Sequence, residues 1–470
     1  MSKKENRERL SLQESLRFLS SLPDYQNQIH AHGYDPGRIC IVDGEEIFNI
    51  KSSNVLRRNF PDVPDELGWT EAIYRTTYQH FVKPILQDGI DNPRPLIGHG
   101  IVNGHWFGSL RDWTKVHHPE AWEAMQNLIR SDSHPIIDSY IHAILPIQHP
   151  RIRKLLIKIG IRAFEDDYDL SVSTDTDKSY GFWPGELAVS QPLIDTLAEN
   201  NIDFLILGRN QINTSIHAPI YKIPTQSGKY MYIFIYDKEL SSKLAFHKNV
   251  DAQKLANDFG YTAICQGFAA SGAADMETFG HWNGNNSLYA LNFLAHKGLP
   301  ALSQTFGRTA DHIVEAKVYN SSWSCWHHAF SRWTGRPNCD CDGADDQLRE
   351  QKRYWYNNLY KHQIHAIKQL DIIDDSWEQV YIDWFLSQRI ALATGQSIDS
   401  NTIEEKYRSA FIQLFVSMIG MTSCGWFFGT SSDFERQIPI NCLGYLEKHY
   451  PLPTPTATTT TTTAGETTSA

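Results

Sequence analysis

The sequence predicts an α/β fold with a parallel sheet or barrel, followed by a bundle of α-helices. Three observations lead to this expectation. From about residue 140, short apolar runs alternate with helical segments, which is typical of strands and helices in βα units. After about residue 344 the pattern changes to helices alone. The chain has 470 residues, and α/β barrels often exceed the usual size of one domain.

The N-terminal part holds a predicted extension and the first regular elements. Residues 1–28 are polar and form the extension. The apolar run RICIV at 38–42 predicts a first strand. Helices are expected over 69–87 and over 119–130, where Pro119 stands at the start.

The central part carries the alternation that defines the barrel, which we expect to span 29–343. Ser190 is a plausible helix N-cap, and Gly298 closes a later helix. The expected elements are strands over 141–146, 203–207, 230–237 and 261–270, and helices over 190–201 and 285–298.

The C-terminal part is predicted to be a helical domain over 344–450, because its apolar residues recur with helical periodicity. The last stretch, 451–470, is rich in threonine and poor in apolar residues. Such a segment cannot bury enough surface to offset its ordering entropy, so a disordered tail is expected.

Composition limits the classes of partner. Hydrophobic residues make up 41% of the chain, and 43 basic against 54 acidic residues give a net charge of −11. An acidic surface repels phosphates, so no nucleic acid or membrane partner is expected, whereas neutral sugars are indifferent to charge. No apolar run suits a signal peptide or membrane span, and the seven cysteines are sparse, so a cytoplasmic protein with reduced thiols is expected. The oligomeric state is left open.

Two segments combine carboxylates with aromatic residues at predicted strand ends. The first is GFWPGELAVSQ at 181–191, and the second is AADMETFGHW at 273–282. Active sites of β/α folds lie at the carboxyl ends of the strands. Glycoside hydrolysis needs two carboxyl groups, and aromatic rings stack on the apolar faces of sugars. Taken singly, each carboxylate could equally be a helix cap or dipole partner, and Trp183 a core residue.

The two segments resemble glycoside hydrolase family 57. GFWPGELAVSQ is similar to the family segment whose glutamate is the nucleophile, and ADMETFGHW to the segment whose aspartate is the general acid/base. The resemblance implies an incomplete (β/α) barrel followed by a helical bundle, with Glu186 as nucleophile and Asp275 as acid/base. Glu277, His281 and Trp282 would then surround the substrate.

A narrower resemblance is to a bacterial subgroup of this family that carries a C-terminal domain of unknown function. It covers about residues 100–445 through the segments 139–169, 321–343 and 421–435. The sequence differs from the subgroup at Gly185, where a bulkier residue is usual. The first-strand motif of the family is matched only by the degenerate IHAHGYDPG at 29–37.

A cysteine and histidine cluster offers a second kind of site. Cys325, His327, His328, Cys339 and Cys341 lie close together in the sequence, and such side chains can bind zinc. Their spacing is not that of a common zinc finger. We therefore expect a loop over the sugar site, with no metal.

The residues and the resemblance together predict a retaining glycoside hydrolase or transglycosidase that acts on an α-glucan without a cofactor. His142, Trp183 and Trp323 are further candidates for binding substrate. Two alternatives remain open: a carbohydrate-binding or regulatory protein without catalysis, and a metal-dependent polysaccharide deacetylase. No convincing His-x-x-x-His metal motif supports the deacetylase.

Overall fold

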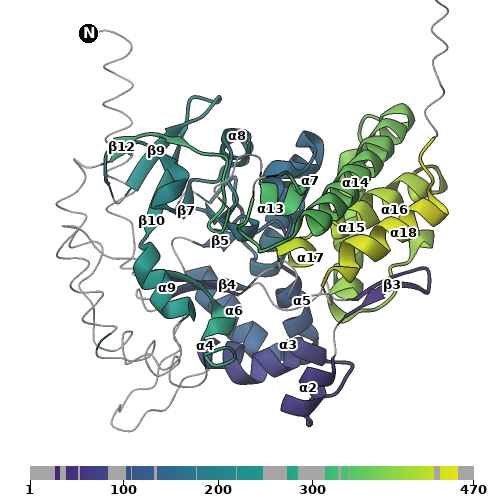
Figure 1. Ribbon diagram of the computed structural model, residues 1–470, viewed down its shortest axis with the longest axis horizontal. Coiled ribbons are helices and arrows are strands. Elements are labelled where there is room, and N and C mark those ends of the chain that lie inside the picture. The colour runs from purple at the N-terminus through teal and green to yellow at the C-terminus, as the bar shows by residue number, and fades with distance from the viewer. Residues whose placement is uncertain are drawn as a thin grey trace, which may run out of the picture.

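The protein combines a parallel sheet with a C-terminal group of helices (Figure 1). A computed structural model describes residues 27–31, 39–50, 53–82, 102–106, 108–131, 135–175, 177–218, 220–246, 254, 272–283, 313–325, 330–337, 339–427 and 435–453. The predicted strand at 261–270 and helix at 285–298 lie outside these residues, as does nearly all of the predicted extension and tail.

In the described part of the chain, two sheets of parallel strands follow one another around the barrel in chain order. β11 (Gly272–Asp275), β1 (Asn27–Ala31) and β4 (Val102–Trp106) form one sheet in that order. A second sheet begins with four parallel strands, which are β5 (Ile136–Ile137), β6 (Gly181–Phe182), β7 (Phe204–Gly208) and β10 (Tyr230–Tyr236). β4 lies against β5, so the two sheets continue one another. The predicted strands at 203–207 and 230–237 are confirmed.

The barrel is incomplete on one side. Among the described residues, β10 pairs on its far side with β9 (Ile220–Pro224), which runs antiparallel, rather than with β11. β12 (Val314–Glu315) then extends this edge beside β9. A short ladder between β8 (Ile212–Asn213) and β13 (Lys317–Val318) lies nearby. The α/β fold with an incomplete barrel therefore agrees with the prediction.

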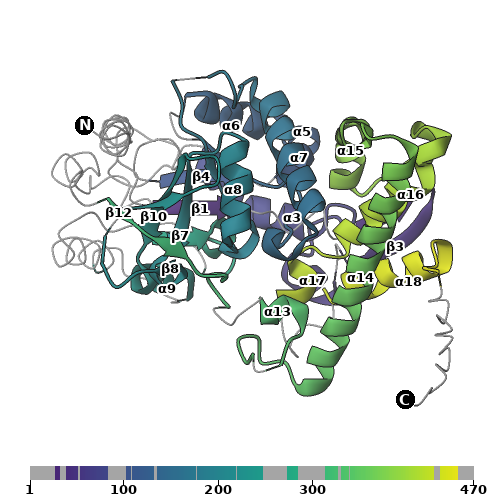
Figure 2. The ribbon, with the colours of Figure 1, turned by 90° about the horizontal axis from the view of Figure 1, so that it is seen from above.

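Helices cover the parallel strands, as Figure 2 shows for α5 to α8. These helices are α5 (Gly108–His117), α6 (Pro119–Ser131), α7 (Pro150–Tyr168) and α8 (Gln191–Glu199). The predicted caps explain two of their starts: Pro119 is the first residue of α6, and the Ser190 hydroxyl accepts from Leu193 N at the start of α8. α9 (Lys238–Phe246) follows β10 and contacts β11.

The predicted helix over 69–87 is helical throughout its described part, but it is not one regular α-helix. α2 (Asn54–Asn59) precedes it. α3 (Gly68–Ile73) passes into a π-helical turn, η1 (Tyr74–Tyr78), and then into α4 (Gln79–Val82).

The C-terminal region consists of helices, as predicted. They are α13 (Ser331–Thr334), α14 (Asp346–Ile373), α15 (Trp377–Thr394), α16 (Glu405–Ile419), α17 (Cys424–Phe427) and α18 (Gln437–His449). They form the green and yellow side of the molecule in Figure 1. One continuous core of buried apolar side chains joins this region to the barrel.

Two expected strands differ from the structure. The expected strand at 141–146 is wrong, because the strand β5 ends at Ile137 and Tyr140 then takes a left-handed conformation, with φ of 66°. Ile141 N bonds locally to Ser139 O, so this backbone does not join the sheet.

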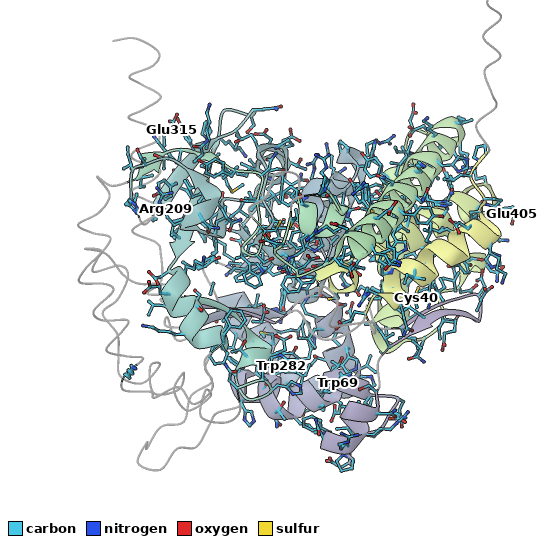
Figure 3. All side chains as sticks on the ribbon, viewed as in Figure 1. Cys40, Trp69, Arg209, Trp282, Glu315 and Glu405 are labelled. Carbon is cyan, nitrogen blue, oxygen red and sulfur yellow. The ribbon has the colours of Figure 1, made fainter. Side chains whose placement is uncertain are left out.

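The run at 38–42 does form a strand, β2 (Ile39–Val42), but it pairs with β3 (Glu45–Asn49) in an antiparallel hairpin and bridges to Ile398 rather than to a barrel strand. This hairpin packs against α18, and Asp43 N donates to Ile398 O in the helical region. Figure 3 shows the labelled Cys40 of β2 beside the C-terminal helices. A segment assigned by sequence to the barrel thus belongs spatially to the helical region.

Candidate active site

Glu186 lies in the 3₁₀ turn η3 (Gly185–Leu187), which follows strand β6 after Trp183 and Pro184. Its backbone is left-handed, with φ of 56° and ψ of 24°, and Leu187 follows with φ of 47°. Such conformations cost a residue with a side chain on the order of 1–3 kcal/mol, and they cluster at functional sites. The turn therefore holds Glu186 at the carboxyl end of β6 in a conformation that the fold itself must stabilise.

Three donors bind the carboxylate of Glu186. His142 Nε2 lies 3.2 Å from Oε1, and Ser423 Oγ donates to the same oxygen at 2.9 Å. The indole Nε1 of Trp323 donates to Oε2 at 2.8 Å. The side chain is 12% exposed, so the carboxylate is nearly buried but still reachable.

These contacts determine the ionisation of Glu186. Burial by itself would raise the pKa of this carboxyl group. The hydrogen bonds from His142, Ser423 and Trp323, together with the charge of His142, outweigh burial and hold the pKa below its usual value. Glu186 is therefore a carboxylate at neutral pH.

The three donors come from separate parts of the chain. His142 lies in the loop after β5, and its carbonyl accepts from Ser423 N at 2.6 Å. Ser423 stands between α16 and α17, and its hydroxyl also accepts from Trp333 Nε1 at 3.3 Å. Ser423 was not singled out from the sequence, although it lies in the segment 421–435 on which the subgroup resemblance rests.

The turn that carries Trp323 is held by backbone hydrogen bonds. Ser321 and Val189 form an antiparallel bridge, with N···O distances of 2.8 and 3.2 Å. Trp323 N donates to Glu186 O at 3.3 Å. The turn is closed further on, where Ser322 N donates to Cys325 O at 2.9 Å. The backbone and the indole of Trp323 therefore both approach Glu186.

Gly185 permits the close approach of η3 to the His142 loop. A Cβ atom built on Gly185 would lie 2.6 Å from Ala143 O, a distance that side chains do not tolerate. A bulkier residue at this position would push Glu186 and His142 apart. The glycine that distinguishes this sequence from the expected pattern is thus required by the packing beside Glu186.

Asp275, the other predicted catalytic residue, is the last residue of β11. It pairs in register with His30 of β1, and it is exposed. Asp275 and Glu186 therefore each follow the carboxyl end of a parallel strand, β11 in one sheet and β6 in the other, which is where β/α folds build their active sites.

Three further predicted site residues follow Asp275. Glu277 is buried, and its Oε1 accepts from the Tyr78 hydroxyl in η1. Burial lowers the pKa of His281 to about 4, so this imidazole is neutral at pH 7. Its Nδ1 lies 3.0 Å from Thr76 Oγ1.

His281 belongs to an aromatic cluster on the α2–α3 side of the barrel. It stacks on Phe60 at 5.6 Å between ring centroids and meets Trp69 and Trp282 edge to face at 5.9 and 4.5 Å. Trp282 is 50% exposed, and Figure 3 shows it beside Trp69. Of the predicted residues that the structure describes, His142 and Trp323 form side-chain hydrogen bonds with Glu186; substrate contact by the others stays a prediction.

Trp183 and Trp323 differ in their surroundings. Trp183 is only 5% exposed and belongs to the main core. Trp323 is half-buried, and its ring is stacked between those of Phe427 and Phe246. The distances between ring centroids are 5.8 Å to Phe427 and 6.5 Å to Phe246. Phe246, at the end of α9, is 66% exposed. An aromatic surface therefore extends from the carboxylate of Glu186 to solvent.

Comparison with known proteins identifies the family to which this sequence belongs. The sequence profile of glycosyl hydrolase family 57 matches residues 31–303, which is more than half of the chain. No curated protein sequence matches it. No helix among the described residues combines the length and apolar character needed to cross a membrane.

Two solved structures are similar in fold. One is an exo-type maltose-forming amylase from Pyrococcus sp. ST04, with a TM-score of 0.57 and 13% identity over 86% of this chain and 75% of that one. The other is a 4-alpha-glucanotransferase from Thermococcus litoralis, with a TM-score of 0.50 and 13% identity, of which the match covers only 57%. The chain therefore belongs to glycosyl hydrolase family 57.

Proposed function

We propose that this protein is a retaining enzyme that cleaves or transfers α-glucans, with Glu186 as the nucleophile and Asp275 as the general acid/base. The observation that carries the proposal is the state of Glu186. It is a strained, nearly buried carboxylate at a strand end, and three donors keep it ionised. A nucleophilic carboxylate must be ionised and must be held in place.

Hydrogen-bond capacity supports Oε2 as the attacking atom. A carboxylate offers about four lone-pair sites on its two oxygens. His142 and Ser423 both occupy Oε1, whereas Oε2 accepts from Trp323 only, as far as the described residues go. Oε2 therefore keeps a lone pair for the anomeric carbon, while the three donors hold the carboxylate against rotation.

The proposed reaction has two steps. Glu186 Oε2 bonds to the anomeric carbon as the glycosidic bond breaks, and Asp275 gives its proton to the leaving oxygen. Water or a sugar hydroxyl then attacks the same carbon, returns a proton to Asp275 and releases Glu186. Water gives hydrolysis, and a sugar hydroxyl gives transfer. This mechanism requires the two carboxyl groups about 5–5.5 Å apart.

The substrate class follows from two considerations. The two structures similar in fold are an amylase and a 4-alpha-glucanotransferase, so α-glucans are the first substrates to test. The row of Phe246, Trp323 and Phe427 offers rings on which sugar faces can stack beside Glu186. Among the described residues, His, Asp and Glu side chains form no metal-binding group, so nothing favours the deacetylase alternative.

Chemical rescue by azide tests the two roles separately. Glu186→Ala and Asp275→Ala should each lose activity on an aryl maltooligosaccharide, and azide should restore product formation. With Glu186→Ala, azide replaces the nucleophile and gives a glycosyl azide of inverted configuration. With Asp275→Ala, azide attacks the glycosyl-enzyme and gives the retained configuration. Glu199→Gln, at an exposed carboxylate of α8, is the control and should match the parent.

The product configuration decides the outcome. If Glu186→Ala is as active as the parent, or if azide gives the same anomer with both variants, the assignment of roles is wrong. Incubating the parent with amylose, glycogen and maltooligosaccharides, with product profiling, separates hydrolysis from transfer.

A further inference from the structure

Three cysteines converge in space close to the segment that holds Trp323. The thiol sulfurs of Cys325, Cys339 and Cys341 all lie within 4.8 Å of one another. Cys325 and Cys339 are almost fully buried, and Cys341 is half-buried. Cys325 ends the Trp323 turn, and the other two precede α14. The fold thus assembles thiols whose sequence spacing alone did not indicate a site.

The separation of the sulfurs fits a shared cation better than a disulfide. The Sγ atoms of Cys325 and Cys339 are 3.8 Å apart. A disulfide joins its sulfurs at about 2.05 Å. Two thiolates bound to one tetrahedral Zn²⁺, each at about 2.3 Å, lie about 3.8 Å apart. Cys325 and Cys339 therefore already have the spacing of two corners of a zinc tetrahedron, and the Cys341 sulfur lies within 4.8 Å of both.

Positive charge lies next to the cluster, as a centre of three thiolates needs. Lys352 is buried, forms an ion pair with Asp342 at 2.5 Å and interacts electrostatically with Cys339. Arg332 donates to the carbonyl of Cys341. Three thiolates and one Zn²⁺ carry a net charge of about −1, so these basic groups reduce the cost of burying the centre.

We propose that Cys325, Cys339 and Cys341 bind one Zn²⁺ as thiolates and that this ion is structural. The proposal replaces the expectation from sequence that the segment holds no metal. His327 and His328, which the sequence groups with these cysteines, lie outside the described residues, and the proposal rests on the three thiolates alone.

The zinc site would connect the Trp323 turn to the helical region. Cys325 lies two residues after Trp323, whose indole binds Glu186 Oε2. Cys339 and Cys341 lie just before α14, and Arg332 links Cys341 to α17 through Phe427 O, at 3.1 Å. A zinc ion would therefore tie the Trp323 turn to the C-terminal helices and keep Trp323 in position.

Metal analysis of the full chain, purified without added metal or chelator, tests the proposal directly. We expect one zinc per chain in the parent. Cys339→Ser and Cys341→Ser should lose it, whereas Cys442→Ser, at a buried thiol outside the cluster, should keep it. Glu186→Gln should also keep its zinc, so this result does not depend on the proposed catalytic roles.

A measurement on the parent alone keeps the test valid if the serine variants do not fold. Replacing zinc by Co²⁺ should give thiolate-to-cobalt charge-transfer absorption and a tetrahedral d–d spectrum. The proposal is overturned if the parent holds no zinc and takes up neither Zn²⁺ nor Co²⁺. It is equally overturned if thiol titration shows a disulfide among these cysteines, if iron with labile sulfide is found, or if folded Cys339→Ser retains zinc.

Discussion

The buried carboxylate of Glu186 and a buried group of aspartates around Arg111 are stabilised in opposite ways. In the first, Glu186 accepts from an imidazole, a hydroxyl and an indole. In the second, the guanidinium of Arg111 binds two carboxylates. Its Nη1 lies 2.7 Å from Asp138 Oδ2, and its Nε lies 2.8 Å from Asp167 Oδ2. Among the described residues, no arginine or lysine forms an ion pair with Glu186, whereas the aspartates are paired with such cations.

The Arg111 network is balanced in charge and joins the two parts of the molecule. Three basic side chains meet three aspartates, which are Arg111, Lys115 and Arg389 with Asp112, Asp138 and Asp167. α5 and α7 of the barrel supply most of these groups, and Arg389 comes from α15. The network therefore attaches the helical region to the barrel.

The difference shows how a carboxylate is kept available for chemistry. A permanent cation beside Glu186 would neutralise its charge and block an oxygen. An imidazole, a hydroxyl and an indole hold the carboxylate ionised and oriented while its charge stays available to the anomeric carbon. Where the role is structural, paired charges are the better solution, because each offsets the desolvation of the other.

The largest expected effect is the loss of turnover in Glu186→Gln. The amide keeps the shape of the side chain but cannot act as the nucleophile, so kcat should fall by several orders of magnitude. Binding of maltooligosaccharides, measured by calorimetry, should persist. An unchanged kcat would mean that Glu186 has no chemical role, and the contrast with the structural aspartates around Arg111 would then fail.

The second prediction concerns the stability of the paired group. Arg111→Ala leaves Asp138 and Asp167 buried without this partner, which should cost about 3–5 kcal/mol of unfolding free energy. Arg57→Ala, which breaks the exposed pair with Asp65, should cost much less, because solvent screens this pair. Urea denaturation of both variants makes the comparison. Equal effects would contradict a structural role for the network.

A smaller effect is expected from removing single donors to Glu186. Trp323→Phe keeps a ring but loses the indole N–H, and Ser423→Ala loses the hydroxyl. A hydrogen bond to a charged group contributes about 1.5–3 kcal/mol, which corresponds to about one to two pKa units.

The pKa of Glu186 should therefore rise in both variants, and the acidic limb of the kcat/KM profile should move to higher pH. Trp122→Phe, in α6 and away from Glu186, is the control and should leave the profile in place. An unshifted limb in both donor variants would mean that these hydrogen bonds do not hold Glu186 ionised.

The smallest expected effect is on stability at acid pH. The pKa of Glu186 is lower in the folded than in the unfolded chain, so its contribution to stability is complete above the unfolded value, near 4.3. The contribution is lost as the pH falls through the folded pKa.

The difference in unfolding free energy between the parent and Glu186→Gln should therefore narrow on acidification below about pH 4.3. Chemical denaturation at pH 7 and at pH 3.5 measures it, with the exposed Glu199→Gln as control. A difference that widened in acid would contradict the lowered pKa.

The sequence alone determined the features that depend on local pattern. The continuous apolar runs predicted β7 and β10, and the Ser190 cap and Pro119 predicted two helix starts. The periodic C-terminal segments predicted α14 and α16. These features could be read because apolar periodicity and capping act within a few residues.

The tertiary structure alone decided what surrounds Glu186 and where two segments belong. Ser423 and Trp323 lie outside the family match at 31–303, yet both bind Glu186. Likewise, strand β2 joined the helical region, and the thiols of Cys325, Cys339 and Cys341 came within 4.8 Å of one another. Each of these contacts depends on the packing of remote segments, and no local pattern records which remote backbone or side chain will satisfy a buried polar group.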